Sequence, residues 1–385
     1  MTGLYVHIPF CEKKCHYCDF AVTTDRSAEM RQRFFSALRC EAEKARAKYG
    51  RFLFDTLYLG GGTPSAVSAA ETEALVSHLR GLFDFAPDFE FTLEMNPGDA
   101  QPEKLRAYRR LGVNRVSLGV QAFQPELLRA MGRSHGVPEI AATARLLREA
   151  GFENVSMDLM FRLPGQTPAH FEESLRRALD LGPAQITAYD LEVLDATAFG
   201  KRKKRGALDL PDEDAHHAMF ALAEKILRGA GYRQYELASF ARPGFECRHN
   251  LIYWKGEDYL GLGPGAVSFL RGARTRVAAD VASYLAKVEQ GNPGLDAEDK
   301  LTPAEREMER LITGLRLEEG ISLEEFPSLA LRVRELFDFW AGHGIVEEKA
   351  GRFTLAQKGR FLAEGVLAEL AAQGIAGRGR EAGVQ

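Results

Sequence analysis

The first half of the chain alternates between strand-like and helix-like segments. Apolar and β-branched runs predict six strands, namely LYVHI (4–8), DTLYLG (55–60), DFEFTLEM (88–95), RVSLGV (115–120), NVSMDLM (154–160) and QITAYDLEV (185–193). Between them, apolar spacings of three and four predict helices over 30–49, 69–83, 102–112, 138–151 and 171–182. Repeated βα units imply a parallel sheet, and six strands suit a partial or full βα barrel with its functional residues at the carboxyl ends of the strands.

The rest of the chain shows weaker patterns. The basic run KRKKRG (201–206) is expected to be a solvated loop, or else a loop that contacts phosphate or propionate groups, and YLGLGPGAVSF (259–269) a glycine-rich loop leading into a strand. Charged helices are expected over 302–317, 321–326 and 331–344, followed by two short strands and a last helix within 345–370. This order suggests a winged-helix-like module, but no helix has the basic face that DNA recognition needs, so we expect no nucleic-acid binding.

These patterns divide the 385 residues into four expected parts: a core barrel over 1–250, a joining segment over 251–300, a small helical C-terminal domain over 301–375 and a disordered tail over 376–385. A hydrophobic fraction of 45% is ample for such a core, and a net charge of −4 gives no general attraction to nucleic acid or anionic membranes. No signal peptide or membrane span is expected. Five cysteines fit no disulfide framework, so we expect a cytoplasmic location.

Three of the cysteines, Cys11, Cys15 and Cys18, lie within eight positions in the spacing C-x3-C-x2-C. Three thiols on one tight loop can converge only on a thiophilic metal or cluster. A structural zinc ion would need a fourth ligand, such as His7 or His16, and normally uses two ligand pairs well separated in sequence. A [4Fe–4S] cluster held by three thiolates leaves one iron open to a small molecule, and we favour it over zinc and over unliganded thiols.

Glycines and polar residues follow the next strands. LGGGTPS (59–65) comes directly after the second strand and is either a tight βα turn or a place where backbone groups approach a ligand. Four polar residues lie along the later strands. Glu94 is at the end of the third strand and Gln121 just after the fourth, while Arg133 is on the following loop and Asp158 within the fifth strand. For any one of them alone, a structural role is as good an explanation as contact with a ligand. Such a role would be a helix cap, or an ion pair of Arg133 with Glu94 or Asp158. Together they predict a binding site at the mouth of the barrel.

The cysteine spacing just after the first strand of a βα array resembles that of radical S-adenosylmethionine (SAM) proteins. The resemblance implies that the open iron binds the amino and carboxylate groups of SAM, and that the reduced cluster cleaves SAM to a 5′-deoxyadenosyl radical. It implies that Gly61, Gly62 and Thr63 receive the amino group. The other SAM contacts that it implies are Glu94, Gln121, Arg133, Asp158, Tyr5 and Tyr17.

Longer segments resemble the coproporphyrinogen oxidase-like branch, and most of all its HemW-type heme chaperones: GLYVHIPFCEKKCHYCDF, GGGTPS, SLGVQAFQ, LPGQT and YELASFARPGFECRHNLIYW. The enzymatic relative, an oxygen-independent coproporphyrinogen III dehydrogenase, has a further cysteine where this chain has Phe20, and a sizeable segment ahead of the cluster. The resemblance therefore implies heme binding and transfer to an acceptor protein, with the dehydrogenase as the alternative. We predict no catalytic residue, leave open whether SAM is cleaved, and expect any membrane contact to be peripheral, through the acceptor.

HNLIYW (249–254) matches the HNxxYW motif implicated in heme binding in those chaperones. His249 is thus the first candidate for ligating heme iron, and Tyr253 and Trp254 offer flat apolar surface to a porphyrin. From the residues alone, a helix-capping or core-facing His–Asn pair is the alternative. Cys247 is a weaker candidate, and Val267 stands where relatives commonly have a histidine, so no ligand is expected there.

Overall fold

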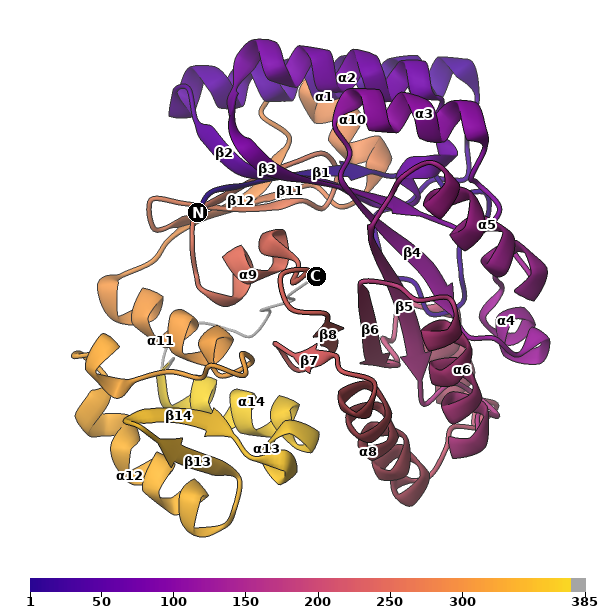
Figure 1. Cartoon of the computed structure of the whole chain (residues 1–385). Helices are drawn as coiled ribbons and strands as arrows, with labels where there is room; N and C mark the ends of the chain where they lie inside the picture. Colours follow the sequence, from indigo (N-terminus) through magenta and orange to yellow (C-terminus); the bar gives the residue numbers. More distant parts are fainter. Residues whose placement is uncertain (375–385) are drawn as a thin grey trace. The chain divides into compact units, whose positions relative to one another are not determined.

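The computed structural model describes residues 1–374 (Figure 1). The described residues form two compact units. The first unit comprises Met1–Gln234, Ala238–Ile252 and Asp258–Asp299, and the second comprises Tyr235–Leu237, Tyr253–Glu257 and the described chain from Lys300 on. The tail predicted over 376–385 lies outside the described residues.

Six parallel strands form the centre of the first unit. They are β1 (Gly3–Ile8), β2 (Leu53–Gly61), β3 (Asp84–Met95), β4 (Arg115–Gln121), β5 (Asn154–Phe161) and β6 (Gln185–Asp190). Each pairs with the next along the chain, so their carboxyl ends share one edge of the sheet. The predicted partial (β/α)6 barrel is thereby confirmed. The last strand does not reach residue 193 as predicted, because its partner β5 ends at Phe161, opposite Asp190.

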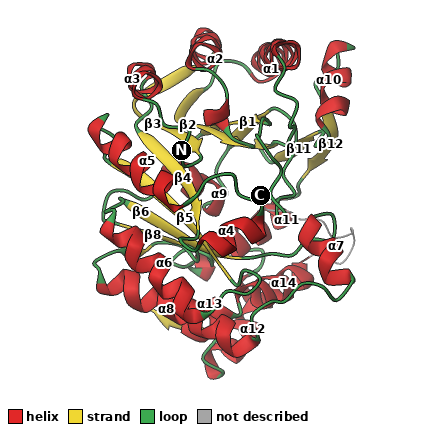
Figure 2. Ribbon diagram, turned by 90° about the vertical axis from the view of Figure 1, so that its right-hand side faces the viewer, coloured by secondary structure: helices red, strands yellow, loops and turns green. Residues whose placement is uncertain are grey.

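Helices cover the outer face of this sheet (Figures 1 and 2). Those between the strands are α1 (Ala28–Tyr49), α2 (Ala69–Leu82), α3 (Pro102–Leu111), α4 (Pro125–Met131), α5 (Val137–Glu149) and α6 (Pro168–Asp180), with a 3-10 turn η1 (Pro64–Ala66) before α2. Helix α4 was not predicted, because its seven residues are too few for a clear apolar period. Strand residues that face the outer helices, such as Leu57, Leu93 and Val116, are fully buried, whereas the concave face carries polar and aromatic side chains.

The chain after β6 forms α7 (Ala198–Lys204), α8 (Glu213–Gly229), β7 (Arg233–Gln234), β8 (Ser239–Ala241) and α9 (Arg248–Trp254). The prediction of a loop over 201–206 was therefore wrong for its first four residues, which belong to α7. Thr197 caps this helix by accepting a hydrogen bond from the backbone nitrogen of Gly200 at 3.0 Å, and the buried ring of Phe199 anchors it. The cap and the buried ring stabilise α7. The side chains of the basic run are exposed to water, which weakens the repulsion between their charges.

The same sheet continues on the other side of β1. Strand β9 (Tyr259–Leu262) pairs in parallel with β1, and β10 (Val267–Leu270), β11 (Ala273–Val277) and β12 (Leu295–Lys300) follow, with α10 (Val281–Glu289) before β12. The loop predicted over 259–269 is thus two strands around a turn, and most of the expected joining segment 251–300 belongs to the first unit. Glycine is needed at Gly261, since a Cβ there would lie 2.2 Å from the carbonyl oxygen of Val267.

The second unit is small and mainly helical. It contains α11 (Pro303–Gly314), a 3-10 turn η2 (Leu323–Glu325), α12 (Ala330–Gly342), the hairpin β13 (Val346–Lys349) and β14 (Arg352–Leu355), α13 (Gln357–Phe361) and α14 (Ala363–Gly374). Phe337, Trp340 and Phe353 lie in its own apolar core. The order agrees with the predicted winged-helix-like module, although 321–326 forms only a short turn. None of the helices described in residues 1–374 is long and apolar enough to cross a membrane.

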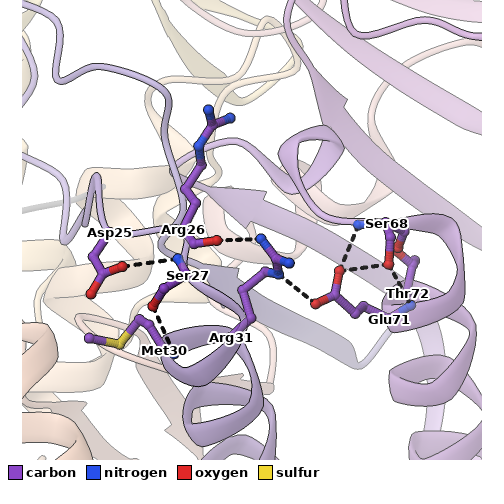
Figure 3. Close-up of polar contacts among 8 residues, drawn as sticks. All are labelled: Asp25, Arg26, Ser27, Met30, Arg31, Ser68, Glu71 and Thr72. Carbon is purple, nitrogen blue, oxygen red and sulfur yellow. Dashed lines mark hydrogen bonds and ion pairs between the residues drawn. The ribbon is translucent and has the colours of Figure 1, made fainter.

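Polar contacts join the starts of α1 and α2 (Figure 3). Ser27 caps α1 by accepting a hydrogen bond from the backbone nitrogen of Met30 at 3.2 Å. Ser68 and Glu71 form a capping box on α2, and Glu71 also accepts from Nε of Arg31 on α1 at 2.8 Å. Because α1 follows the cysteine loop and α2 follows the glycine-rich turn, these contacts fix where both loops end.

A buried carboxyl group ties α1 to the far side of the sheet. Oε2 of Glu41 accepts hydrogen bonds from the hydroxyl of Tyr284 on α10 at 2.8 Å and from the backbone nitrogen of Gly263 at 2.9 Å. Gly263 has a φ of +93°, and a Cβ there would lie 2.6 Å from the carbonyl oxygen of His7. Burial raises the pKa of Glu41 to about 7, although both hydrogen bonds act in the opposite direction.

We expect Glu41→Gln to remove a pH dependence of stability. Because the pKa of Glu41 is raised in the folded chain from 4.5 to about 7, folding favours the protonated carboxyl. This contribution to the free energy of unfolding is fully present below pH 4.5 and is lost as the pH rises to 7, by roughly 3 kcal/mol. Urea unfolding between pH 4.5 and 8 should show wild type losing stability relative to Glu41→Gln. The exposed Glu73→Gln serves as the control, and parallel curves for wild type and Glu41→Gln would contradict the assignment.

Candidate cofactor site

The three clustered cysteines lie on a loop fixed to the carboxyl end of β1. The backbone nitrogen of Cys11 donates to the carbonyl of Thr23 at 3.0 Å, and that of Thr23 donates to the carbonyl of Pro9 at 2.8 Å. The backbone nitrogen of Cys18 donates to the carbonyl of Cys15 at 3.2 Å, which closes a tight turn. Cys11 is buried, whereas the other two thiols are partly exposed. The loop therefore holds all three thiols close to the mouth of the barrel.

The two histidines considered as fourth ligands bind elsewhere. The backbone nitrogen of His16 donates to the carbonyl of Met131 at 2.9 Å, and its Nδ1 lies 2.8 Å from the carbonyl oxygen of Ala130. Nε2 of His7 lies 2.8 Å from the carbonyl oxygen of Ala21, and burial lowers the pKa of His7 to about 4. Within residues 1–374, no three cysteine, histidine or acidic side chains gather closely enough to hold a single metal ion. Both histidine rings are thus within hydrogen-bond distance of backbone carbonyl oxygens.

The thiols need a cationic partner in order to ionise together. Burial, with smaller contributions from the neighbouring Cys15 and Cys11, raises the pKa of Cys18 to about 11, although a backbone hydrogen bond from Phe20 acts in the opposite direction. Burial also raises the pKa of Cys11. Arg133 supplies one positive charge, since its Nη1 lies 3.6 Å from Sγ of Cys15. Three thiolates would still leave an excess of negative charge, which the iron ions of a cluster would offset, so the donor set fits such a group.

Asn96, which follows β3, connects the two sides of the cysteine loop. Its Nδ2 donates to Oγ1 of Thr63 at 3.1 Å, and its Oδ1 accepts from Nη2 of Arg133 at 2.6 Å. Oγ1 of Thr63 lies 3.5 Å from Sγ of Cys11, so polar contacts run from Cys11 through Asn96 to Arg133 and Cys15. Thr63 and Arg133 were predicted from the sequence, whereas Asn96 was not. The available signal was its place directly after a predicted strand end.

The glycine-rich turn after β2 packs against β1. A Cβ on Gly61, which has a φ of +108°, would lie 2.6 Å from the ring of His7. A Cβ on Gly62 would lie 2.7 Å from the carbonyl carbon of Pro9, and the backbone nitrogen of Gly62 donates to the carbonyl of Ile8 at 2.9 Å. Both glycines are therefore required by the close approach of two strands. Their contact with SAM remains a prediction.

Glu94 binds the backbone of that turn. Its Oε2 accepts from the nitrogen of Gly61 at 3.0 Å, and its Oε1 accepts from the hydroxyl of Tyr58 at 2.8 Å. Burial raises the pKa of Glu94 to about 7, although the Tyr58 hydrogen bond acts in the opposite direction. Glu94 is thus bonded to the turn in place of the ion pair with Arg133 considered from the sequence.

Gln121 and Asp158 lie at different depths of the concave face. Gln121 ends β4 with a φ of +68°, a strained conformation for a residue with a side chain and one that clusters at functional sites. Its Oε1 accepts from the hydroxyl of Tyr189 at 2.7 Å. Asp158 lies within β5 and accepts from the hydroxyl of Ser117 at 3.0 Å, and burial raises its pKa. Gln121 is therefore at the mouth, and Asp158 is deeper in the barrel.

Tyr17, Gln121 and Arg133 gather beside the end of β4. Nη2 of Arg133 donates to the carbonyl of Gly119 at 2.8 Å, and a Cβ on Gly119 would lie 3.2 Å from both this nitrogen and Nε2 of Gln121. Tyr17 packs against the apolar side chains around α4, and burial raises the pKa of its hydroxyl. These residues, the cysteines, Thr63 and Glu94 form one group at the carboxyl edge of the sheet.

Tyr5 and His249 lie progressively farther from that edge. The ring of Tyr5 is 6.0 Å from that of Tyr58 and 6.3 Å from that of His249. His249 is only 1% exposed, its Nδ1 lies 2.6 Å from Oγ1 of Thr56, and burial lowers its pKa to about 3. Because β1 spans roughly 16 Å from Gly3 to its end, His249 is at the opposite end of the sheet from the cysteines. The structure thus brings His249 close to Tyr5 but not to the cysteines.

Other polar residues on the concave face were missed from the sequence: the half-buried Tyr58 and the buried Glu90 and Arg115. Each alternates with buried apolar residues that face the outer helices. The sequence shows polar side chains at alternate positions of these strands. Because alternate residues face opposite sides of a sheet, this pattern could have predicted a polar face inside the barrel.

Comparisons with known proteins agree with this geometry. The family model described as the radical SAM superfamily matches residues 5–178. The heme chaperone HemW of Bacillus subtilis is 37% identical over 328 residues, which cover 85% of this chain and 86% of that protein. The heme chaperone HemW of Escherichia coli is 37% identical over 264 residues, which cover 69% of each. This chain belongs to the HemW family of radical SAM proteins.

Among solved structures, the coproporphyrinogen III oxidase HemN of Escherichia coli matches with a TM-score of 0.84 at 26% identity, covering 96% of this chain and 89% of that one. The predicted fold class, a radical SAM barrel with a small helical C-terminal domain, is confirmed. Membership of the radical SAM superfamily implies SAM and a [4Fe–4S] cluster as cofactors.

Replacing a ligand cysteine should abolish the cluster. Anaerobically reconstituted wild type is expected to hold roughly four irons per chain. We expect Cys11→Ser, Cys15→Ser and Cys18→Ser each to hold fewer than about one, because two thiolates bind a cluster poorly. Cys40→Ser, which changes a thiol on α1, is the matched control. Full iron content in any of the three variants, measured by metal analysis, would refute the assignment.

Asn96→Ala should loosen the cluster without removing a ligand. The variant loses two side-chain hydrogen bonds, worth about 1 kcal/mol each, between Thr63 and Arg133. Iron loss to a chelator is expected to be several-fold faster than in wild type. Asn114→Ala is a matched control, since Asn114 also makes two hydrogen bonds to β3, but at Phe89 and Phe91 near the middle of the strand. Equal rates in both variants would show that Asn96 plays no part at the site.

Proposed function

We propose that this protein binds heme and delivers it to an acceptor protein, and that it carries a [4Fe–4S] cluster and SAM. The observation that carries the proposal is the likeness to several proteins named heme chaperone HemW, at 31–37% identity over most of the chain. The cysteine loop and its surroundings support the cofactor part.

Cys11, Cys15 and Cys18 would bind three irons of the cluster and leave the fourth open for SAM. When bound and reduced, the cluster supplies an electron to the sulfonium of SAM. The chain itself contributes position and charge: Arg133 places a guanidinium beside Cys15, and Asn96 fixes that guanidinium relative to the rest of the loop. The burial of Cys11 keeps water from one side of the group.

SAM would lie among the polar residues at the carboxyl edge. The glycine-rich turn at Gly61, Gly62 and Thr63 would receive its amino group, with Glu94 holding the turn in place. The remaining proposed contacts are Gln121, Arg133, Asp158, Tyr5 and Tyr17. Tyr17 is suited to the adenine, because it combines a partly exposed ring with a position between two cluster ligands.

No heme ligand is assigned among the motif's buried residues. His249 is enclosed by protein, and Cys247 is buried with its Sγ donating to Oε1 of Glu90 at 3.6 Å. Tyr253 and Trp254 are only half-buried, so they are the aromatic side chains of HNLIYW that we propose for contact with a porphyrin.

We also propose a cytoplasmic location and only peripheral membrane contact, through the acceptor. The support is chemical, since three thiols that bind a cluster need a compartment that keeps thiols reduced.

Heme titration of the anaerobically reconstituted protein tests the proposal. We expect saturable uptake of about one heme per chain, and transfer of that heme to an apo-protein acceptor. Lysozyme at the same concentration serves as the nonspecific control. Uptake that does not saturate, or that equals the lysozyme control, would overturn the heme chaperone assignment while leaving the cluster in place.

The second candidate function is radical decarboxylation of coproporphyrinogen III, favoured by the 0.84 TM-score with HemN. The exposed Phe20, two positions after Cys18, replaces the cysteine that the resemblance leads one to expect in that enzyme. Reconstituted protein with dithionite, SAM and coproporphyrinogen III should therefore form no protoporphyrinogen, with Escherichia coli HemN as the positive control. Turnover comparable to that of HemN would favour the enzyme.

A further inference from the structure

The ring of His249 rests on a row of residues that crosses three strands. The strand register aligns Gly3, Thr56 and Glu90 on β1, β2 and β3. Nδ1 of His249 lies 2.6 Å from Oγ1 of Thr56, and a Cβ on Gly3 would lie 3.1 Å from Cε1 of the ring. The imidazole is therefore packed directly on the backbone of β1, and glycine at position 3 makes room for it.

Glu90 fixes the start of the same helix. Its carboxylate accepts hydrogen bonds from the backbone nitrogens of Arg248 at 3.0 Å and His249 at 3.1 Å, and from Sγ of Cys247 at 3.6 Å. The first backbone N–H groups of a helix lack partners within the helix, so a buried acceptor here stabilises α9 in one place. Two adjacent strands thus bind α9, one through Thr56 and one through Glu90.

Two aromatic rings cover His249 on the side that faces the cysteine end. The ring of Tyr58 lies 5.0 Å away and that of Tyr5 lies 6.3 Å away, both at 32° to the imidazole. Axial ligation places a ring nitrogen at bonding distance from an iron in the centre of a flat macrocycle. With strands on one side and tyrosine rings on the other, a macrocycle has no room beside this imidazole.

We infer that His249 is a positioning residue that ties α9 to β1 and β2, and that it does not ligate heme iron. The part that concerns heme rests on the proposed function, whereas the tie to the strands does not. Since burial lowers the pKa of His249 to about 3, the ring stays neutral and its contact with Thr56 persists near neutral pH.

Hydrogen–deuterium exchange of the full chain without heme tests the positioning role. Thr56→Val and Glu90→Gln each remove a polar contact to α9 with little change in volume. Amide exchange over 248–254 should accelerate at least fivefold in both variants. Glu71→Gln, which weakens the cap of α2 and its contact with Arg31 on α1, is the matched control and should affect only α2 and the start of α1. The inference is overturned if exchange in α9 stays within twofold of wild type in both variants.

Ferric heme titration tests the absence of ligation. In His249→Ala, bound heme should keep the absorption and electron paramagnetic resonance spectra of wild type, while its affinity falls at least threefold. Exposed His343→Ala is the control. If the wild-type spectrum is lost in His249→Ala and added imidazole restores it, His249 is an axial ligand and the inference is wrong. If wild type takes up no heme, the proposed function fails, and the exchange experiment alone decides the role of His249.

Discussion

The parallel register of β1 and β2 determines where the candidate site forms. It pairs Ile8 with Gly61, so the cysteine loop and the glycine-rich turn leave the sheet side by side. Their backbones approach so closely that a side chain at Gly61 or Gly62 would meet His7 or Pro9 at less than 3 Å. These glycines are thus needed for strand packing before any ligand arrives. The cofactor end of the barrel depends on this packing, because a displaced turn would carry Thr63 away from the first ligand cysteine.

The concave face is divided into rows by the same register. The lowest row, at Thr56 and Glu90, binds α9. The next row carries Tyr5 and Tyr58, and their rings lie between the lowest row and the carboxyl group of Glu94. Burying a polar side chain costs free energy unless the side chain is hydrogen-bonded. In these rows the partners come from a neighbouring strand or from α9. The base is filled by the protein's own side chains, whereas the mouth is where we propose that the cofactors bind.

The sequence predicted what is encoded locally. Strand alternation and the cysteine spacing are patterns within one segment, so six strands and the cluster loop could be found. Residue spacing could not reveal Asn96, because its two partners come from separate loops. Nor could it reveal β9 and β10, where Gly261 weakens the strand pattern but permits the strands to meet. The HNLIYW motif drew attention to His249, but it could not show that this side chain is buried, because burial depends on the strands against which the helix packs.

The HNLIYW motif gains a physical explanation when its residues are assigned to the units that hold them. Helix α9 begins in the first unit, where His249 contacts Thr56, and ends in the second, where the guanidinium of Arg316 lies 4.4 Å from the ring of Trp254. A change at His249 would therefore alter the position of the half-buried residues that follow it, without direct contact between the histidine and heme. On this view the motif acts through the geometry of the helix, which positions the half-buried Tyr253 and Trp254 proposed for contact with a porphyrin.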